Sequence, residues 1–105
     1  MENKIYLNSL LDFYGKLLTE KQQEICNYYY AEDFSLNEIA EIENISRSAV
    51  YDTVRRCRKE LDAYEDKLHL YAHYKKRMTL YEEMKKHCSS EMNVLIDQCI
   101  DTEIE

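Results

Sequence analysis

Apolar residues recur three and four positions apart along most of the chain, which is the spacing of one face of an α-helix. The first such run predicts a helix that ends near residues 15–18, with a buried face made of Leu7, Leu10, Leu11, Tyr14 and Leu18. Thr19 and Gln22 fit a capping box that starts a second helix, which runs to about Ala31. We expect Ile25, Cys26 and Tyr29 on the buried side of this second helix.

Two further helices joined by a short turn are predicted in the middle of the chain. Ser35 and Glu38 form a second capping box, which starts a helix over 36–42. Residues 43–45 interrupt this helix, and Ser46 caps the next one. Two helices separated by about three residues form a helix-turn-helix.

The helix after Ser46 has no helix breaker for some forty residues. Its apolar stripe changes near Lys75, which predicts that the helix bends or changes the partner on which it packs. Ser89 or Ser90 then caps a last helix, whose apolar stripe is Met92, Leu95, Ile96, Cys99 and Ile100. The pattern predicts an all-α fold: a helix-turn-helix domain over 1–64 and a long C-terminal helical extension over 65–105, within one compact unit.

The composition agrees with helices and limits the class of protein. The 105 residues include one glycine and no proline, so few residues break a helix. No secretion signal and no apolar run of ~20 residues is visible, so a cytoplasmic location is expected. The cysteines at 26, 57, 88 and 99 are scattered, which favours reduced packing residues over a disulfide or a reactive thiol.

The net charge of −7 argues against wholesale binding to nucleic acid, but the charge is unevenly distributed. Residues 1–45 carry three basic and nine acidic residues, and residues 60–105 carry six and eleven. Residues 46–59 carry five basic residues and one acidic residue. The only positive stretch therefore lies at the start of the second helix of the helix-turn-helix.

Seven side chains of this stretch are candidates for nucleic-acid contact, because the periodicity leaves them off the buried face: Arg47, Ser48, Tyr51, Arg55, Arg56, Arg58 and Lys59. Arginine can bond a guanine edge, serine can reach a phosphate, and tyrosine can touch a thymine methyl. The alternative is a solvated basic face with pairs within the helix, such as Asp52 with Arg55. Asp52 and the acidic flanks would also repel phosphate, and the sequence leaves both interpretations open.

Three positions fit the constraints of a helix-turn-helix. Ala40 falls where the two helices would cross, and a larger side chain would separate them. Asn44 falls in the turn, where a left-handed backbone is needed and asparagine is the best residue after glycine. Val50 faces inward, and we expect it to close the small core with Ile39, Ile45 and Val54.

The segment from Ser35 to Leu61, SLNEIAEIENISRSAVYDTVRRCRKEL, resembles region 4 of bacterial sigma factors in its acidic-isoleucine-alanine triplet, turn, serine and valine. The wider chain from Leu10 to about Met84 looks like the YlxM family of helix-turn-helix proteins. This resemblance implies a small all-helical protein encoded beside signal recognition particle genes in bacteria, which acts in or regulates that pathway and has no established DNA target. Asn44 stands where the typical motif has glycine.

Other candidate sites are weaker. No glycine-rich phosphate loop, nucleophile motif or distinctive carboxylate pair is present, so we expect neither an enzyme nor a cofactor. His69 and His73 have the spacing of two zinc ligands but lack a third, so we expect no metal. The basic residues 75–77 could bind RNA phosphates, although a solvated patch is the simpler interpretation. Successive tyrosines at 28–30 point about 100° apart on a helix and cannot form one stacking platform.

Two functions remain open. The first is a non-catalytic regulator or accessory factor of the signal recognition particle pathway, with the particle's components, DNA or RNA as partners. The second is a sequence-specific DNA-binding transcription regulator. The C-terminal half carries more apolar stripes than its own helices can cover, which predicts a homodimer through the C-terminal helices. A monomer whose helix bends to hide both stripes is the alternative.

Overall fold

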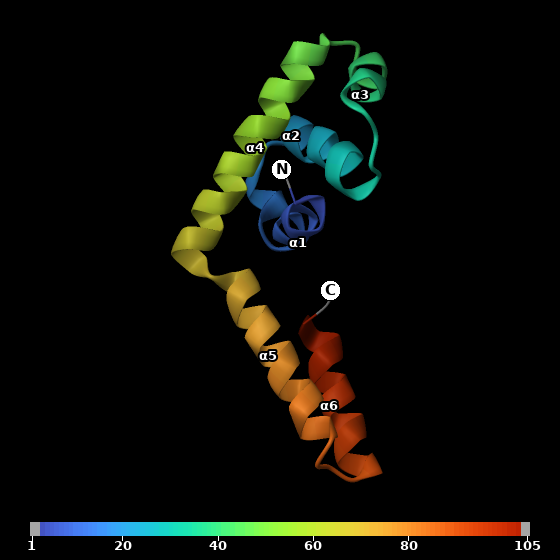
Figure 1. Cartoon of the computed structure of the whole chain (residues 1–105), viewed down its shortest axis with the longest axis vertical. Coiled ribbons are helices and arrows are strands. Elements are labelled where there is room, and N and C mark those ends of the chain that lie inside the picture. The colour runs from blue at the N-terminus through green and yellow to red at the C-terminus, as the bar shows by residue number, and fades with distance from the viewer. Residues whose placement is uncertain (1–2, 104–105) are drawn as a thin grey trace. The chain divides into compact units, whose positions relative to one another are not determined.

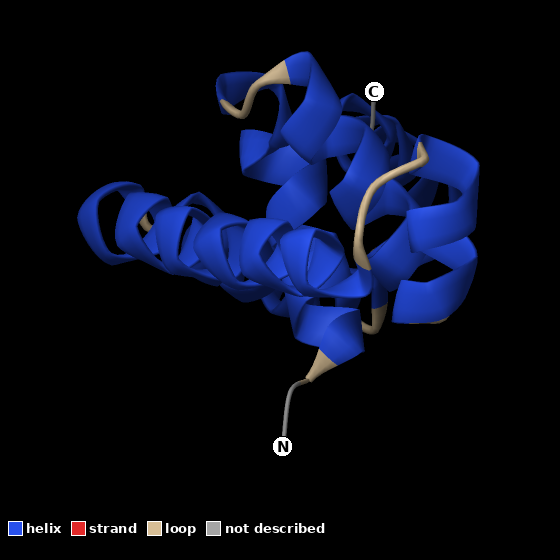
Figure 2. Cartoon of the chain, turned by 90° about the horizontal axis from the view of Figure 1, so that it is seen from above, coloured by secondary structure: helices blue, strands red, loops and turns tan. Residues whose placement is uncertain are grey.

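The computed structural model describes residues 3–103, and every regular element within them is a helix (Figures 1 and 2). The all-α fold predicted from the sequence is confirmed. Residue contacts divide the chain into two compact units, one ending at His69 and the other beginning at Leu70, which we call unit 1 and unit 2. The elements in chain order are α1 (Lys4–Tyr14), the 3-10 turn η1 (Gly15–Leu17), α2 (Glu20–Cys26), the π-helical turn η2 (Asn27–Ala31), α3 (Leu36–Glu43), α4 (Arg47–Leu68), α5 (Leu70–Lys85) and α6 (Ser90–Glu103).

Unit 1 is built on α4, against which α1, α2 and α3 pack (Figure 1). The apolar face predicted for the first helix is buried as expected, together with the inward positions of α4. The buried apolar side chains of unit 1 are Leu7, Leu10, Leu11, Tyr14, Leu18, Ile25, Cys26, Tyr30, Ile39, Val50, Val54, Cys57 and Leu61. All four α-helices of the unit and η2 contribute to this buried set, and α1, α2 and α3 each contact α4.

The predicted capping boxes form as the sequence suggests. The amide of Gln22 donates to Thr19 Oγ1 at 3.2 Å, and the amide of Thr19 donates to Gln22 Oε1 at 3.0 Å. Ser35 and Glu38 exchange the same two bonds at 3.1 and 3.0 Å. These contacts satisfy amides that have no partner inside the helix.

A π-helical turn after α2 corrects one prediction. Tyr29 was expected on the buried side of the second helix, but it is half-buried, and Tyr30 is buried instead. Residues 27–31 form η2, which has more residues per turn than an α-helix. The wider turn shifts the inward position by one residue, from Tyr29 to Tyr30.

The prediction of one helix of some forty residues after Ser46 is also wrong, because two helices occupy this stretch. The α4 helix ends at Leu68, and His69 adopts the left-handed conformation with φ 56°. The His69 amide still donates to the Glu65 carbonyl at 2.9 Å, which closes the last turn. Histidine tolerates this region better than most side chains, so the helix ends without glycine or proline.

A buried polar contact links the first helix of unit 1 to the end of α4. The Tyr14 hydroxyl donates to Glu65 Oε1 at 2.5 Å, and Glu65 is only 8% exposed. The Tyr14 ring also stacks on Tyr64 with ring centroids 5.8 Å apart. Because a buried carboxylate needs hydrogen-bond donors, this contact fixes α1 against the C-terminal part of α4.

Unit 2 is an antiparallel hairpin of α5 and α6 (Figure 1). Two ion pairs join the helices, Arg77 with Glu103 at 2.7 Å and Lys85 with Asp97 at 2.8 Å. Ile96 is the only buried apolar residue among 70–103. Half-buried side chains fill the rest of the contact between the helices: Tyr74, Met78, Tyr81, Asn93 and Ile100.

Candidate nucleic-acid interface

The turn between α3 and α4 has the backbone that a helix-turn-helix needs. Asn44 ends α3 in the left-handed conformation, with φ 56° and ψ 45°, as predicted from its position. The amide of Ile45 donates to the Ala40 carbonyl at 3.1 Å, which closes the end of α3. Ser46 Oγ then accepts the amide of Ala49 at 3.1 Å and caps α4. The helix-turn-helix predicted from the sequence is therefore present, but Ile45, which was expected in its small core, is 39% exposed because it lies in the turn.

An ion pair helps to hold α3 in place within unit 1. Lys21 on α2 lies 2.7 Å from Glu43 on α3, whose side chain is only 5% exposed. The hydrogen bond and the charge of Glu43 raise the pKa of Lys21 above its usual value. Since Ile39 and Val50 are also fully buried, α3 is fixed against α2 and α4 by both packing and charge.

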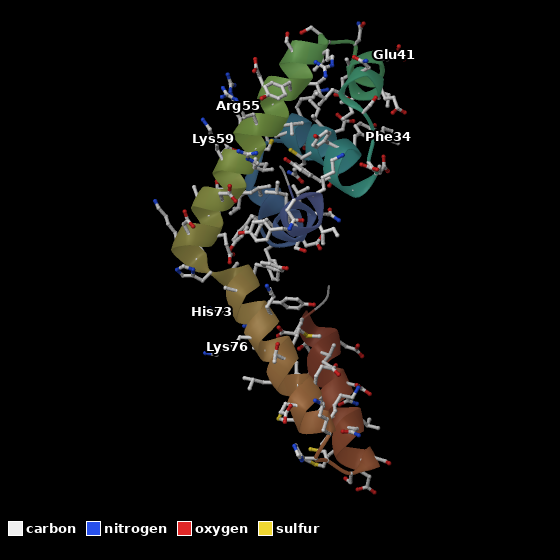
Figure 3. All side chains as sticks on the ribbon, viewed as in Figure 1. Phe34, Glu41, Arg55, Lys59, His73 and Lys76 are labelled. Carbon is white, nitrogen blue, oxygen red and sulfur yellow. The ribbon has the colours of Figure 1, made fainter. Side chains whose placement is uncertain are left out.

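All seven candidate residues of α4 are exposed, as expected from the periodicity of the helix. Arg55 and Lys59 project from the side of α4 that faces away from α2 and α3 (Figure 3). Ser48 Oγ lies 3.2 Å from the capping hydroxyl of Ser46. Tyr51 exposes about half of its surface.

The basic side chains are not neutralised by the pairs within α4 that the sequence allowed. Within residues 3–103, neither Arg55 nor Arg56 forms an ion pair with Asp52 or Glu60. Arg47 and Lys59 likewise form no ion pair in the described part of the chain. These four cations therefore remain available for an external anion.

Acidic residues limit the positive face at its C-terminal end. The pKa of Asp62 is raised, mainly because the carboxyl group is partly buried, and repulsion from Asp66 adds to this effect. Arg58 attracts the Asp62 carboxylate and lowers the pKa in part. The positive charge of Arg58 is thus partly offset by Asp62.

The helix α3 carries three acidic residues and no basic one. Glu38 is engaged in the capping box and Glu43 in the ion pair with Lys21, but Glu41 is exposed. In helix-turn-helix complexes with DNA, the helix that precedes the recognition helix crosses the phosphate backbone. Glu41 would repel that backbone, which is a local effect that the net charge of the segment does not reveal.

The tyrosine triplet at 28–30 is engaged in packing. The Tyr28 ring stacks on Phe34 with centroids 5.4 Å apart, and Tyr29 meets Tyr30 edge to face at 5.0 Å. The Lys4 ammonium lies 4.1 Å from the centre of the Tyr29 ring. These rings therefore do not form the stacked platform that single-stranded nucleic acid uses.

The two histidines considered as metal ligands do not share a helix. His69 ends α4, and His73 lies within α5. Among residues 3–103 no group of three or more histidine, cysteine, aspartate or glutamate side chains is placed to hold a metal ion. Cys26 and Cys57 are buried, whereas Cys99 is exposed.

Membrane insertion was a further question for a chain rich in apolar stripes. None of the helices in the described part of the chain combines the length and the apolar character that a membrane span needs.

Comparisons with known proteins agree with the geometry. Residues 1–99 match a family model described as "Putative helix-turn-helix protein, YlxM / p13 like", UPF0122. The chain is 48% identical to the UPF0122 protein YofM of Lactococcus lactis, covering 85% of this chain and 80% of that protein. It is 43% identical to a UPF0122 protein of Clostridium perfringens over 100% of this chain and 96% of that protein. The chain therefore belongs to the UPF0122 family of YlxM/p13-like helix-turn-helix proteins.

Proposed function

We propose that this chain is a non-catalytic accessory factor or regulator of the bacterial signal recognition particle pathway, and that it contacts nucleic acid through α4. The observation that carries the nucleic-acid contact is the set of exposed cations on α4 without an ion pair in the described residues: Arg47, Arg55, Arg56 and Lys59. The assignment to the pathway rests on the family resemblance, and a cytoplasmic location is part of the proposal.

The contact that we propose is with phosphates rather than with base edges. Arg55 and Lys59 are one helical turn apart on the exposed side of α4, so both can reach one backbone strand. Exposed Glu41 on α3 disfavours the deep entry into a major groove that base recognition requires. Such a contact gives affinity that depends strongly on salt and little on base sequence.

A sequence-specific DNA-binding regulator is the second candidate. It is favoured by the exposed side chains at the start of α4, where a recognition helix meets base edges: Arg47, Ser48 and Tyr51. Glu41 on α3 and Asp52 on α4 lie near these three residues in the sequence. Their negative charges oppose the approach of phosphates. We therefore rank this function second.

Self-association through the C-terminal helices is also part of the proposal. Within residues 70–103, six large apolar side chains are more than one third exposed: Leu70, Leu80, Met84, Met92, Val94 and Leu95. A hairpin with one buried apolar residue gains little from its own packing, so a partner surface would stabilise it. A two-fold homodimer is the commonest closed solution.

A pull-down from a lysate of the source cells, with and without nuclease, separates the two functions. The signal recognition particle function predicts that the particle's RNA and protein co-purify with the tagged chain. Recovery of a defined DNA fragment without particle components would support the transcription regulator. Recovery of neither nucleic acid nor particle protein would reject both functions.

The salt dependence of binding to the recovered nucleic acid tests the role of α4. Replacing Arg55, Arg56 and Lys59 with alanine should reduce the slope of log affinity against log salt by about 0.7 to 0.9 for each lost phosphate contact. Lys16→Ala is the matched control, because it removes an exposed cation from η1 and should leave the slope unchanged. An unchanged slope in the triple variant would exclude α4 as the phosphate-binding helix.

A further inference from the structure

Unit 2 exposes a group of large side chains that its own two helices do not cover. On α5 these are Leu80 and Met84, at 55% and 44% exposure. On α6 they are Met92 and Leu95, together with exposed Cys99. We call this set the open face: Leu80, Met84, Met92, Leu95 and Cys99.

The geometry of the hairpin places the whole set on one side. Each residue of an α-helix is rotated by about 100° from the one before it. Around the axis of α5, Leu80 and Met84 therefore lie about 100° from the half-buried residues on the side of α6, which are Tyr74, Met78 and Tyr81. On α6, Met92, Leu95 and Cys99 likewise lie about 100° from the residues on the side of α5, which include Asn93, Ile96 and Ile100. Viewed along the chain, the rotation about the helix axis has the same sense in both helices. Since the helices are antiparallel, equal rotations in the same sense put both stripes on the same side of the hairpin.

The opposite side of the hairpin is mostly charged. The same construction places four charged residues there: Lys75, Glu82, Asp97 and Asp101. Val94 also lies on that side, with 56% exposure, almost equal to the 55% of its neighbour Leu95. The hairpin is therefore amphipathic as a unit, with one apolar side and one charged side.

We propose that the open faces of two copies of this chain pack against each other, so that the two hairpins form a four-helix bundle. This inference rests on the self-association proposed above and names its surface. A two-fold dimer brings the same patch of each copy together, which suits a face to which both helices contribute. Small antiparallel bundles of this kind bury apolar positions from facing helices in their centre.

The charges of the two helices select one of the two possible two-fold arrangements. The helix α5 has four basic and two acidic residues, whereas α6 has four acidic residues and no basic one. A two-fold axis parallel to the helices places α5 of each copy over α6 of the other, which brings opposite charges together. An axis across the helices places α5 over α5 and α6 over α6, which brings like charges together. We therefore commit to the first arrangement.

The ion pairs within the hairpin fix which residues would meet. Arg77 lies level with Glu103, and Lys85 lies level with Asp97. A two-fold axis parallel to the helices preserves these levels between copies. Leu80 should therefore lie beside Cys99 of the second copy, and Met84 between Leu95 and Cys99 of the second copy.

The size of the open face sets the expected affinity. Fourteen residues of α6 span about 21 Å, and two helices side by side are about 20 Å wide. An interface of this size is at the small end of the range for specific complexes, below about 1,200 Å² in total. We expect dissociation in the micromolar range rather than the nanomolar range.

Sedimentation equilibrium of the full chain from about 1 to about 200 µM tests the proposal. The wild-type protein should shift from 12.7 kDa towards twice that mass. Leu95→Asp should weaken the dimer at least about tenfold. Val94→Asp is the matched control, because it adds the same charge at an equally exposed position on the opposite side. Helicity measured by circular dichroism confirms that both variants fold.

The possible outcomes distinguish a failure of the proposed surface from a failure of self-association. A wild-type protein that stays monomeric at every concentration would overturn both the open face as an interface and self-association. A dimer that Leu95→Asp leaves intact, or that Val94→Asp weakens equally, would overturn the open face and leave self-association standing. Neither outcome depends on nucleic-acid binding by α4.

Disulfide formation tests the arrangement of the two copies. In a Cys88→Ser background, Leu80→Cys should form an interchain disulfide with Cys99 under mild oxidation, because the two positions come level and close. Thr79→Cys is the control, since residue 79 lies off the open face. A link between two copies of Cys99, identified by peptide mass, would overturn the arrangement of α5 over α6.

Discussion

Units 1 and 2 are both built from amphipathic helices but differ in what they bury. Among the described residues, unit 1 buries thirteen apolar side chains and unit 2 buries only Ile96. The core of unit 1 collects side chains from four α-helices, and their apolar stripes all point to α4 or to its neighbours. In unit 2 each helix has two stripes, and only one of them is covered.

The difference shows that amphipathic helices do not by themselves make a stable domain. A helix is stabilised mainly by burial of its apolar face, because its intrinsic propensity is small. Unit 1 achieves that burial within one chain, whereas most large apolar side chains of α5 and α6 stay partly or largely exposed to water. The free energy of unfolding should therefore be concentrated in unit 1.

The largest expected effect comes from opening a cavity in the core of unit 1. Leu61 is fully buried, and Leu61→Ala should lower the free energy of unfolding by about 2–5 kcal/mol. Ile96→Ala in unit 2 should change the main thermal transition much less, because it lies outside that core. Differential scanning calorimetry measures both variants. Equal losses would contradict the contrast between the units.

A smaller effect is expected at the buried polar contact of unit 1. Tyr14→Phe removes the donor to Glu65 and should cost about 1–3 kcal/mol, because a buried carboxylate loses a hydrogen bond. Tyr64→Phe is the matched control, since the Tyr64 hydroxyl has no hydrogen bond in the described residues while its ring stacks on Tyr14. Urea unfolding should show a lower midpoint for the first variant only.

The backbone of the turn gives the third effect in size. Asn44 adopts the left-handed region, where a residue with a β-carbon and no compensating side chain costs about 1–2 kcal/mol. Asn44→Ala should therefore lower the free energy of unfolding by about 1 kcal/mol. Asn44→Gly should be neutral or slightly stabilising. If both variants unfold at the wild-type denaturant concentration, the turn does not contribute to the stability of unit 1.

Much of unit 1 could be predicted from local chemistry. The capping boxes at Thr19 and Ser35 and the turn at Asn44 depend on a few neighbouring residues, so the sequence reveals them. The exposure of the candidate residues follows from the inward positions of α4, which begin with Val50 and Val54. Whether those residues meet nucleic acid depends on a partner, and the local pattern contains no information about it.

Other features depend on packing that the sequence pattern does not encode. The π-helical turn at 27–31 changes the register of one turn, and no residue type requires it. The helix break at His69 uses a side chain that is compatible with helices as well as with the left-handed region. The sequence therefore predicted one helix that bends or changes its partner near Lys75, instead of two helices that meet at His69.

The smallest expected effect lies at the border between the positive face of α4 and its acidic end. The raised pKa of Asp62 means that the folded state favours the protonated carboxyl group. The contribution of Asp62 to stability is therefore present below its unfolded pKa and is lost as pH rises through the higher folded value. At neutral pH, Asp62→Asn should stabilise the fold by less than about 0.5 kcal/mol. This advantage should disappear at acid pH, because the carboxyl group is then neutral in both states.

Unfolding of Asp62→Asn and wild type in urea at neutral and acid pH measures this difference. Asp52→Asn is the matched control, because it removes an equal charge from an exposed position of the same helix. The partial burial of Asp62 predicts a gain that depends on pH for Asp62→Asn and is absent from Asp52→Asn. An equal gain in both variants would assign the effect to the overall charge of α4 instead. The same substitution removes a negative charge close to Arg58, so it should also strengthen phosphate binding by α4 at low salt.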